Sequence, residues 1–142
     1  MTTENLWGEL EPVDFAQPVM ILRQQATKLG ELTKNILKGD VRLIQAGGPT
    51  VGYALEVLAP AVGGYRHRVL AIQYALLAPY PLEIMGEGNR LPVQCETEED
   101  FIQNLPSILQ SGAVQKPIGI LLTLSQQALQ PADAVPKAGT GP

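Results

Sequence analysis

His67 and the two arginines beside it are the residues whose types and spacing could do chemistry in this sequence. His67 is the only histidine, so Ser–His or Cys–His catalysis would have to use it. On a β-strand, Arg66 and Arg68 project together from one face and His67 projects from the other. Two arginines on one face can grip a carboxylate or a phosphate. The alternative, which the pattern favours, is that these charges, next to Tyr65, end an apolar strand and keep it from pairing wrongly.

Cys95 and the acidic residues after it are a second place where chemistry could occur. Cys95 is the only cysteine, which excludes an internal disulfide and a zinc site made of thiolates. Glu96, Glu98 and Glu99 would oppose a thiolate, so we expect a buried structural thiol. The acidic run also lacks the alternating ligands and the glycine of a calcium loop. The sequence contains no HExxH or GxSxG motif, and it favours a non-enzymatic protein without a metal or cofactor.

The acidic segment 1–17, which has no basic residue, is a third candidate. Leu6, Trp7 and Leu10 resemble the apolar points of peptides that dock an aromatic anchor into a partner's groove. The alternative, which the sequence favours, is that Trp7 and Phe15 fold back and cover the chain's own sheet. The candidate binding residues are Trp7, Leu10, Tyr65, Arg66, His67 and Arg68.

The element that must position the arginines is an apolar hairpin from Val51 to Leu77, with its turn at Gly63-Gly64. Both arms look apolar on both faces, which predicts a sheet covered on both sides. On the second arm, alternation predicts a large-residue face and a small-residue face. The large face comprises Leu70, Ile72, Tyr74 and Leu76, and the small face Val69, Ala71, Gln73 and Ala75.

Helices are expected on either side of the hairpin. Apolar residues at three- and four-residue steps predict a helix over 18–38, which begins at Pro18 and ends before Gly39. Strands are expected at 40–47, 82–85 and 91–96. A capping box from Thr97 to Asp100 begins another helix, which Pro106 should kink or split. Residues 113–128 predict a third helix, with a strand over 118–124 as the alternative.

These elements predict an α+β fold, in which a long N-terminal helix packs on an antiparallel meander of three to five strands and two helical segments follow. At 142 residues, we expect one domain over 18–128, between the acidic lead 1–17 and a flexible tail 129–142. A net charge of −4 argues against a nucleic-acid binder. Only 17% of residues are charged, which favours an oligomer or a protein partner. No secretory signal or membrane-spanning run is seen, so we expect a cytoplasmic protein. The low Lys content and the frequent Ala, Gly, Pro and Leu are typical of a bacterial source.

Two functions remain open on the sequence. The first is an interaction module, such as an acidic accessory, inhibitor or immunity-type partner of a larger protein. The second is a small-ligand-binding domain, or an unrecognised enzyme, with a pocket between the first helix and the sheet. The interaction module is ranked first. Tight packing of that helix would exclude the pocket, whereas a void above ~300 Å³ with a polar group or two would reverse this ranking.

Overall fold

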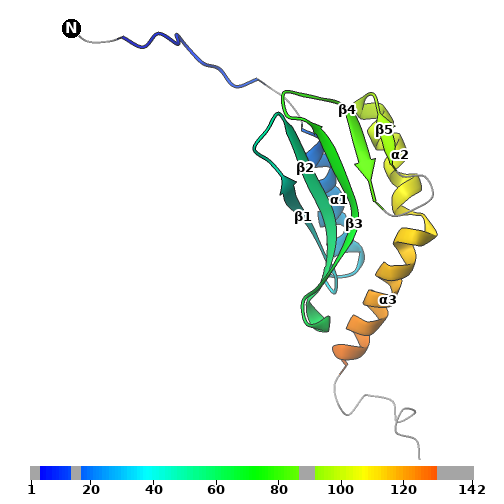
Figure 1. Cartoon of the computed structure of the whole chain (residues 1–142). Coiled ribbons are helices and arrows are strands. Elements are labelled where there is room, and N and C mark those ends of the chain that lie inside the picture. Colours follow the sequence, from blue (N-terminus) through cyan, green and yellow to red (C-terminus); the bar gives the residue numbers. More distant parts are fainter. Residues whose placement is uncertain (1–3, 14–16, 87–91, 131–142) are drawn as a thin grey trace, which may run out of the picture.

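The computed structural model describes residues 4–13, 17–86 and 92–130, and it has three helices and a five-stranded sheet (Figure 1). The elements are α1 (Pro18–Leu32), β1 (Lys38–Gln45), β2 (Thr50–Ala59), the 3-10 turn η1 (Pro60–Val62), β3 (Tyr65–Ala75), β4 (Ala78–Met85), β5 (Val93–Cys95), α2 (Glu98–Leu109) and α3 (Gly112–Ala128). The strands lie in the order β1-β2-β3-β4-β5, each antiparallel to the next. The predicted α+β class is confirmed.

The hairpin of β2 and β3 turns where the sequence indicates, through η1 and two glycines. Gly63 and Gly64 have φ angles of 68° and 76°, a left-handed conformation that suits glycine. The pairing register shifts between Leu55 and Glu56, because Leu55 lies opposite Leu70 and Glu56 lies opposite Arg68. Val69 is therefore the extra residue of a β-bulge, and side chains on either side of it alternate in opposite phase.

The prediction of a helix over 18–38 is wrong at its C-terminal end, because α1 ends at Leu32. Lys34 and Asn35 both have positive φ, and the Asn35 N–H donates to the Gly30 carbonyl at 2.7 Å, which ends the helix. Gly39 is not the helix stop but part of β1. There the backbone of α1 at Ala26 comes so close that a Cβ on Gly39 would overlap it.

The two C-terminal helices follow the predicted pattern closely. Thr97 caps α2, because its hydroxyl accepts from the Asp100 N–H at 3.1 Å. The Asp100 carboxylate accepts from the Glu96 N–H at 3.2 Å, one residue earlier than in an ordinary capping box. Pro106 does not split α2, which continues to Leu109. Residues 112–128 are helical, so the alternative of a strand over 118–124 is wrong.

The helices cover one face of the sheet only. The core forms where this covered face meets the helices, and it includes Leu22, Leu55, Val57, Leu70, Ile72, Tyr74, Ile84, Phe101 and Leu105. The opposite face, which we call the open face, carries Ala54 and Glu56 of β2 and Arg66 and Arg68 of β3. The expectation of two apolar faces is therefore wrong, because the second face is built from small and charged residues.

Residues 4–13, which we call the lead, run away from the folded body (Figure 1). The Trp7 residue is 79% exposed, and Leu6, Leu10 and Val13 are exposed as well. The expectation that Trp7 folds back onto the sheet is therefore wrong, while Phe15 and residues 131–142 of the predicted tail lie outside the described residues. Within the described part of the chain, no helix is both long enough and apolar enough to cross a membrane.

Candidate functional site

A groove of about 440 Å³ lies on the covered side, between α1 and the pair α2 and α3. Its floor is the middle of the sheet, at Leu55, Val57 and Val69. One wall is the stripe of α1 residues Ile21, Gln24, Gln25, Lys28, Leu29 and Leu32. The other wall includes Ile102, Leu105, Pro106, Leu109, Val114 and Ile118. The lining is mainly apolar, so an apolar occupant would gain free energy by leaving water.

The groove exists because the helices are anchored at opposite edges of the sheet. The close approach at Gly39 holds α1 over β1 and β2. The buried side chain of Phe101 anchors α2 at the other edge of the sheet, next to β5. The strip of sheet between them is left without a helix directly above it, and β2 and β3 form its floor.

The rim of the groove carries apolar side chains that face water. Leu32 is 83% exposed and Ile102 is 50% exposed. Gln24, Lys28 and Gln110 supply exposed polar groups along the same rim. The first helix therefore does not fill the space above the sheet, and the void that would favour a binding pocket is present. Sequence periodicity alone did not show it, because the expected helix 18–38 would have covered more of the sheet.

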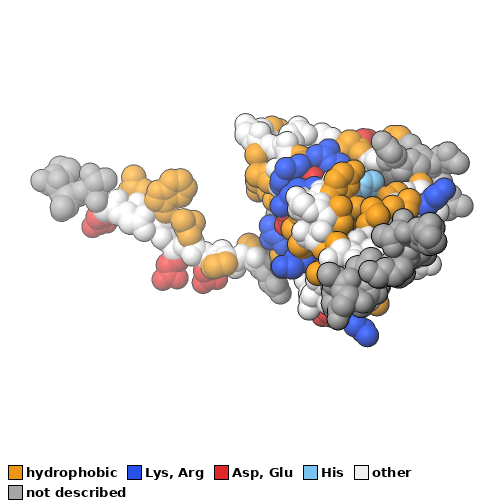
Figure 2. Space-filling model, turned by 90° about the horizontal axis from the view of Figure 1, so that it is seen from below, with side chains coloured by type: hydrophobic (Ala, Val, Ile, Leu, Met, Phe, Trp, Pro, Cys, Tyr) orange, Lys and Arg blue, Asp and Glu red, His pale blue; other side chains and the backbone are white. Residues whose placement is uncertain are grey.

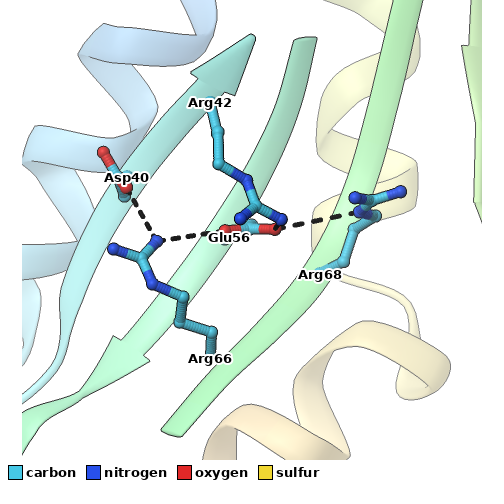
Figure 3. A network of polar contacts seen from close by, with 5 residues as sticks. All are labelled: Asp40, Arg42, Glu56, Arg66 and Arg68. Carbon is cyan, nitrogen blue, oxygen red and sulfur yellow. Dashed lines mark hydrogen bonds and ion pairs between the residues drawn. The ribbon is translucent and has the colours of Figure 1, made fainter. Parts of the chain in front are cut away.

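A network of five charged residues lies on the open face of β1, β2 and β3 (Figure 3). Glu56 is at its centre, with a side chain that is only 4% exposed. Arg42 donates to one carboxylate oxygen of Glu56 at 2.9 Å, and Arg66 donates to the other at 3.1 Å. Arg66 also donates to Asp40 at 2.8 Å. Arg68 Nε lies 3.9 Å from the Glu56 carboxylate, a longer ion pair without a hydrogen bond.

The electrostatics of the network leave a surplus of positive charge. A carboxylate removed from water needs such partners, because burying it alone would be very costly. Hydrogen bonds to Asp40 and then Glu56 raise the pKa of Arg66 above its ordinary value. Arg68 makes no hydrogen bond to any described residue, so its donors remain available to a ligand. The network thus orients three arginines on one surface, and only two carboxylates compensate them.

The bulge at Val69 decides which face the arginines occupy. Simple alternation from Leu70 would place Arg68 and Arg66 on the covered face. The extra residue instead brings Arg68 opposite Glu56 and Arg66 opposite Leu58, on the open face. His67 lies opposite Val57, on the covered side, and is half-buried. The arginines and His67 therefore face opposite ways, as expected.

Cys95 is buried beneath α2. Burial, followed by the nearby Asp100, raises the pKa of its thiol. A protonated thiol out of contact with water is a poor nucleophile, so the expectation of a buried cysteine is confirmed. No three His, Cys, Asp or Glu side chains within the described ranges gather closely enough to hold a metal ion.

The candidate binding residues fall into two separate groups. Trp7 and Leu10 are in the extended lead, and Tyr65 to Arg68 begin β3. The ion pairs of Arg66 and Arg68 with described residues go to Asp40 and Glu56, not to the lead. Glu56 was missed, although a single carboxylate inside the apolar strand from Val51 to Ala59 signals that a cation must lie beside it.

The geometry is the basis for assigning a function. Comparisons of the chain with protein-family models, with curated proteins and with solved structures find no match.

Proposed function

We propose that the chain is a non-enzymatic binding protein that receives the apolar side chains of another protein's amphipathic helix in the groove beside α1. The observation that supports this proposal is an open apolar groove with exposed Leu32 and Ile102 at its rim. Apolar side chains left in water on both sides of a groove are typical of surfaces that a partner covers.

The shape and chemistry of the groove suit a helix. The α1 stripe from Ile21 to Leu32 extends over roughly 16 Å at 1.5 Å per residue, which matches about three turns of a partner helix. A helix that binds in a groove places residues i, i+3 or i+4, and i+7 against the floor. Its polar side would then face water, close to Gln24, Lys28 and Gln110 at the rim. An amphipathic occupant therefore satisfies both the floor and the rim.

A small amphiphilic molecule is a second candidate occupant, which the size of the void supports; we place it after the helix because it would leave the exposed Leu32 and Ile102 at the rim in water. The volume of about 440 Å³ falls within the range of small-molecule pockets, ~300–1,000 Å³. Lys28 at the rim would pair with an acidic head group while the apolar tail lay on Leu55 and Val57. This occupant would make the chain a carrier of an amphiphile rather than a partner of a protein.

Two matched substitutions test the groove. Ile102→Glu puts a charge into its wall, and Ile120→Glu puts the same charge on α3 at a position that does not line it. The two side chains are 50% and 51% exposed, so folding should be affected equally. We expect the wild type and Ile120→Glu to capture the partner from the native host, and Ile102→Glu to fail to capture it.

A peptide of the captured protein then decides between the occupants. It should become helical on binding, and a photoreactive amino acid at Leu32 should cross-link to it. Equal capture by both variants would contradict the proposal. Displacement of an apolar fluorescent dye by long-chain fatty acids, with no peptide binding, would replace it with the amphiphile carrier.

A further inference from the structure

The open face is basic in a chain that is acidic overall. The protein has a net charge of −4, yet β1 and β3 bring Lys38, Arg42, Arg66 and Arg68 to one face. Asp40 and Glu56 are the acidic residues that pair with them, and Glu83 of β4 is exposed on the same face. The surplus of positive charge therefore lies over β1 and the start of β3, away from Glu83. Figure 2 shows several Lys and Arg side chains close together on one side of the body. A surface with a surplus of positive charge attracts an acidic partner and disfavours others.

The lead has the complementary chemistry. Glu4, Glu9 and Glu11 give it three acidic residues, and it has no basic residue. Its apolar side chains, Leu6, Trp7, Leu10 and Val13, are all more than three-quarters exposed. Figure 2 shows these hydrophobic and acidic side chains extending together from the body. Such a segment has much to gain from a surface that is both basic and partly apolar.

We propose that the open face of one copy of this chain binds the lead of a second copy, so that two copies exchange leads and form a dimer. The lead carboxylates pair with Arg42, Arg68 and Lys38, and Trp7 stacks on a guanidinium. Glu56 already holds Arg42 and Arg66 in place, so little side-chain entropy is lost on binding. This inference is independent of the groove, which lies on the other side of the sheet.

The geometry favours a second copy over the same copy. Gln17 ties the start of α1 to the far end of β3, because the Tyr74 hydroxyl donates to its side chain at 2.8 Å. Arg68 is about six residues back along β3, or ~20 Å, and the chain from Trp7 to Gln17 spans ~35 Å when fully extended, so chain length does not decide between the copies. The described lead runs away from its own body (Figure 1), and the ion pairs of Arg66 and Arg68 with described residues go to Asp40 and Glu56. A lead that points away from its own open face is placed to meet the open face of a second copy.

The lead suits the open face better than the groove. Among the described residues that line the groove, Lys28 is the cation, so three carboxylates would find little compensation there. Residues 4–13 contain no helix, and at Asn5 the chain makes a turn in which the Asn5 side chain donates to the Gly8 carbonyl at 3.1 Å. An extended acidic segment therefore belongs on the sheet face, and an amphipathic helix in the groove.

Analytical ultracentrifugation of the full chain at 50 mM salt tests the proposal. A dimer is expected, and Glu4→Gln, Glu9→Gln and Glu11→Gln together should raise its dissociation constant at least tenfold. A control with the same change in net charge, Gln103→Lys, Gln126→Lys and Gln127→Lys on exposed helix positions, should change it less than twofold. The groove variant Ile102→Glu should leave the dimer unchanged.

A mixing experiment identifies the copy that supplies the lead. One chain carries Glu4→Gln, Glu9→Gln and Glu11→Gln, and the other carries Lys38→Glu and Arg68→Glu. Each should be monomeric alone, whereas the mixture should form heterodimers through the one remaining lead and open face. Trp7, the only tryptophan, should shift its emission to shorter wavelength only in the mixture.

Three results would overturn the proposal. They are a wild-type monomer at about 100 µM with a water-exposed Trp7, a dimer that keeps its affinity in the lead variant, and a monomer whose Trp7 emission is already shifted because the lead binds its own chain.

Discussion

The network around Glu56 makes a quantitative prediction about how its arginines cooperate. Arg42 and Arg66 each donate a short hydrogen bond to a carboxylate that is almost completely buried. Replacing either arginine by alanine leaves Glu56 one short partner, and replacing both leaves only Arg68 at 3.9 Å. The double variant should therefore lose more stability than the two single variants together.

The expected magnitudes follow from these contacts. One hydrogen bond to a charged group contributes ~1.5–3 kcal/mol. Arg42 and Arg66 are about half exposed, so solvent screening reduces the loss in each single variant to about 1 kcal/mol. The double variant strands a buried carboxylate, which costs about 3–5 kcal/mol. The coupling free energy should then be at least about 1 kcal/mol.

Equilibrium unfolding in urea, followed by far-ultraviolet circular dichroism, measures the four free energies of unfolding. The measurement is made on the monomer, at high salt and low protein concentration. In the monomer Trp7 is exposed in the folded chain, so its fluorescence would not report on this unfolding. The pair Lys28 and Glu31, 3.8 Å apart with both side chains exposed, is the matched control and should couple by less than about 0.5 kcal/mol. If the stability lost in the double variant equals the sum of the two single losses at Arg42 and Arg66 within about 0.5 kcal/mol, Glu56 is not their shared, buried partner.

Three further outcomes are expected from unfolding measurements. Gly39→Ala should lower the free energy of unfolding by at least about 2 kcal/mol, since its Cβ would overlap the backbone of α1. Gly119→Ala, in open space on α3, should raise it by ~0.5–1 kcal/mol. An equal effect at both sites would contradict the close approach. Burial raises the pKa of Tyr74 and that of Tyr80 to about 12. Unfolding frees both tyrosines to ionise near 10, so it should become easier between pH 10 and 12, and not below, by about 2 kcal/mol for each tyrosine, and Tyr74→Phe should remove about half of this slope. Ser125→Ala should stabilise by about 1 kcal/mol, because the buried Ser125 hydroxyl has no hydrogen-bond partner among the described residues; a loss of that size would mean that the hydroxyl is satisfied.

The sequence was sufficient for the elements and the class of the fold, where a local signal determines the local structure. Gly63-Gly64 permits the tight turn of the hairpin, and Thr97 with Asp100 begins α2. The C-terminal end of α1 was misjudged, because apolar spacing continues through Ile36 after the helix has ended. Lys34 and Asn35 end it with positive φ, a conformation that neither residue type requires.

The small residues of the open face were predicted, but alternation did not predict the position of Arg66 and Arg68 on it, because that depends on a single residue of strand register. Alternation along β3 was read correctly from Leu70 to Tyr74, but Val69 was assigned to the wrong face. A bulge is a property of two paired strands, so one strand's sequence does not reveal it. A pocket between the first helix and the sheet was predicted only as an alternative, and its second wall was not predicted, since the separation of α1 from α2 depends on the Gly39 contact and not on either helix alone.

The chain order of the sheet also bears on how the protein folds. Each strand pairs with the next strand in the chain, so most of the structure forms over short loops whose closure costs little entropy. The exception is α3, which packs on η1 and β2, about 50 residues earlier in the chain. We therefore expect the groove wall that α3 supplies to form after the sheet and to open before it. Such opening would let the groove widen for a bulkier occupant while the sheet and α1 stay folded.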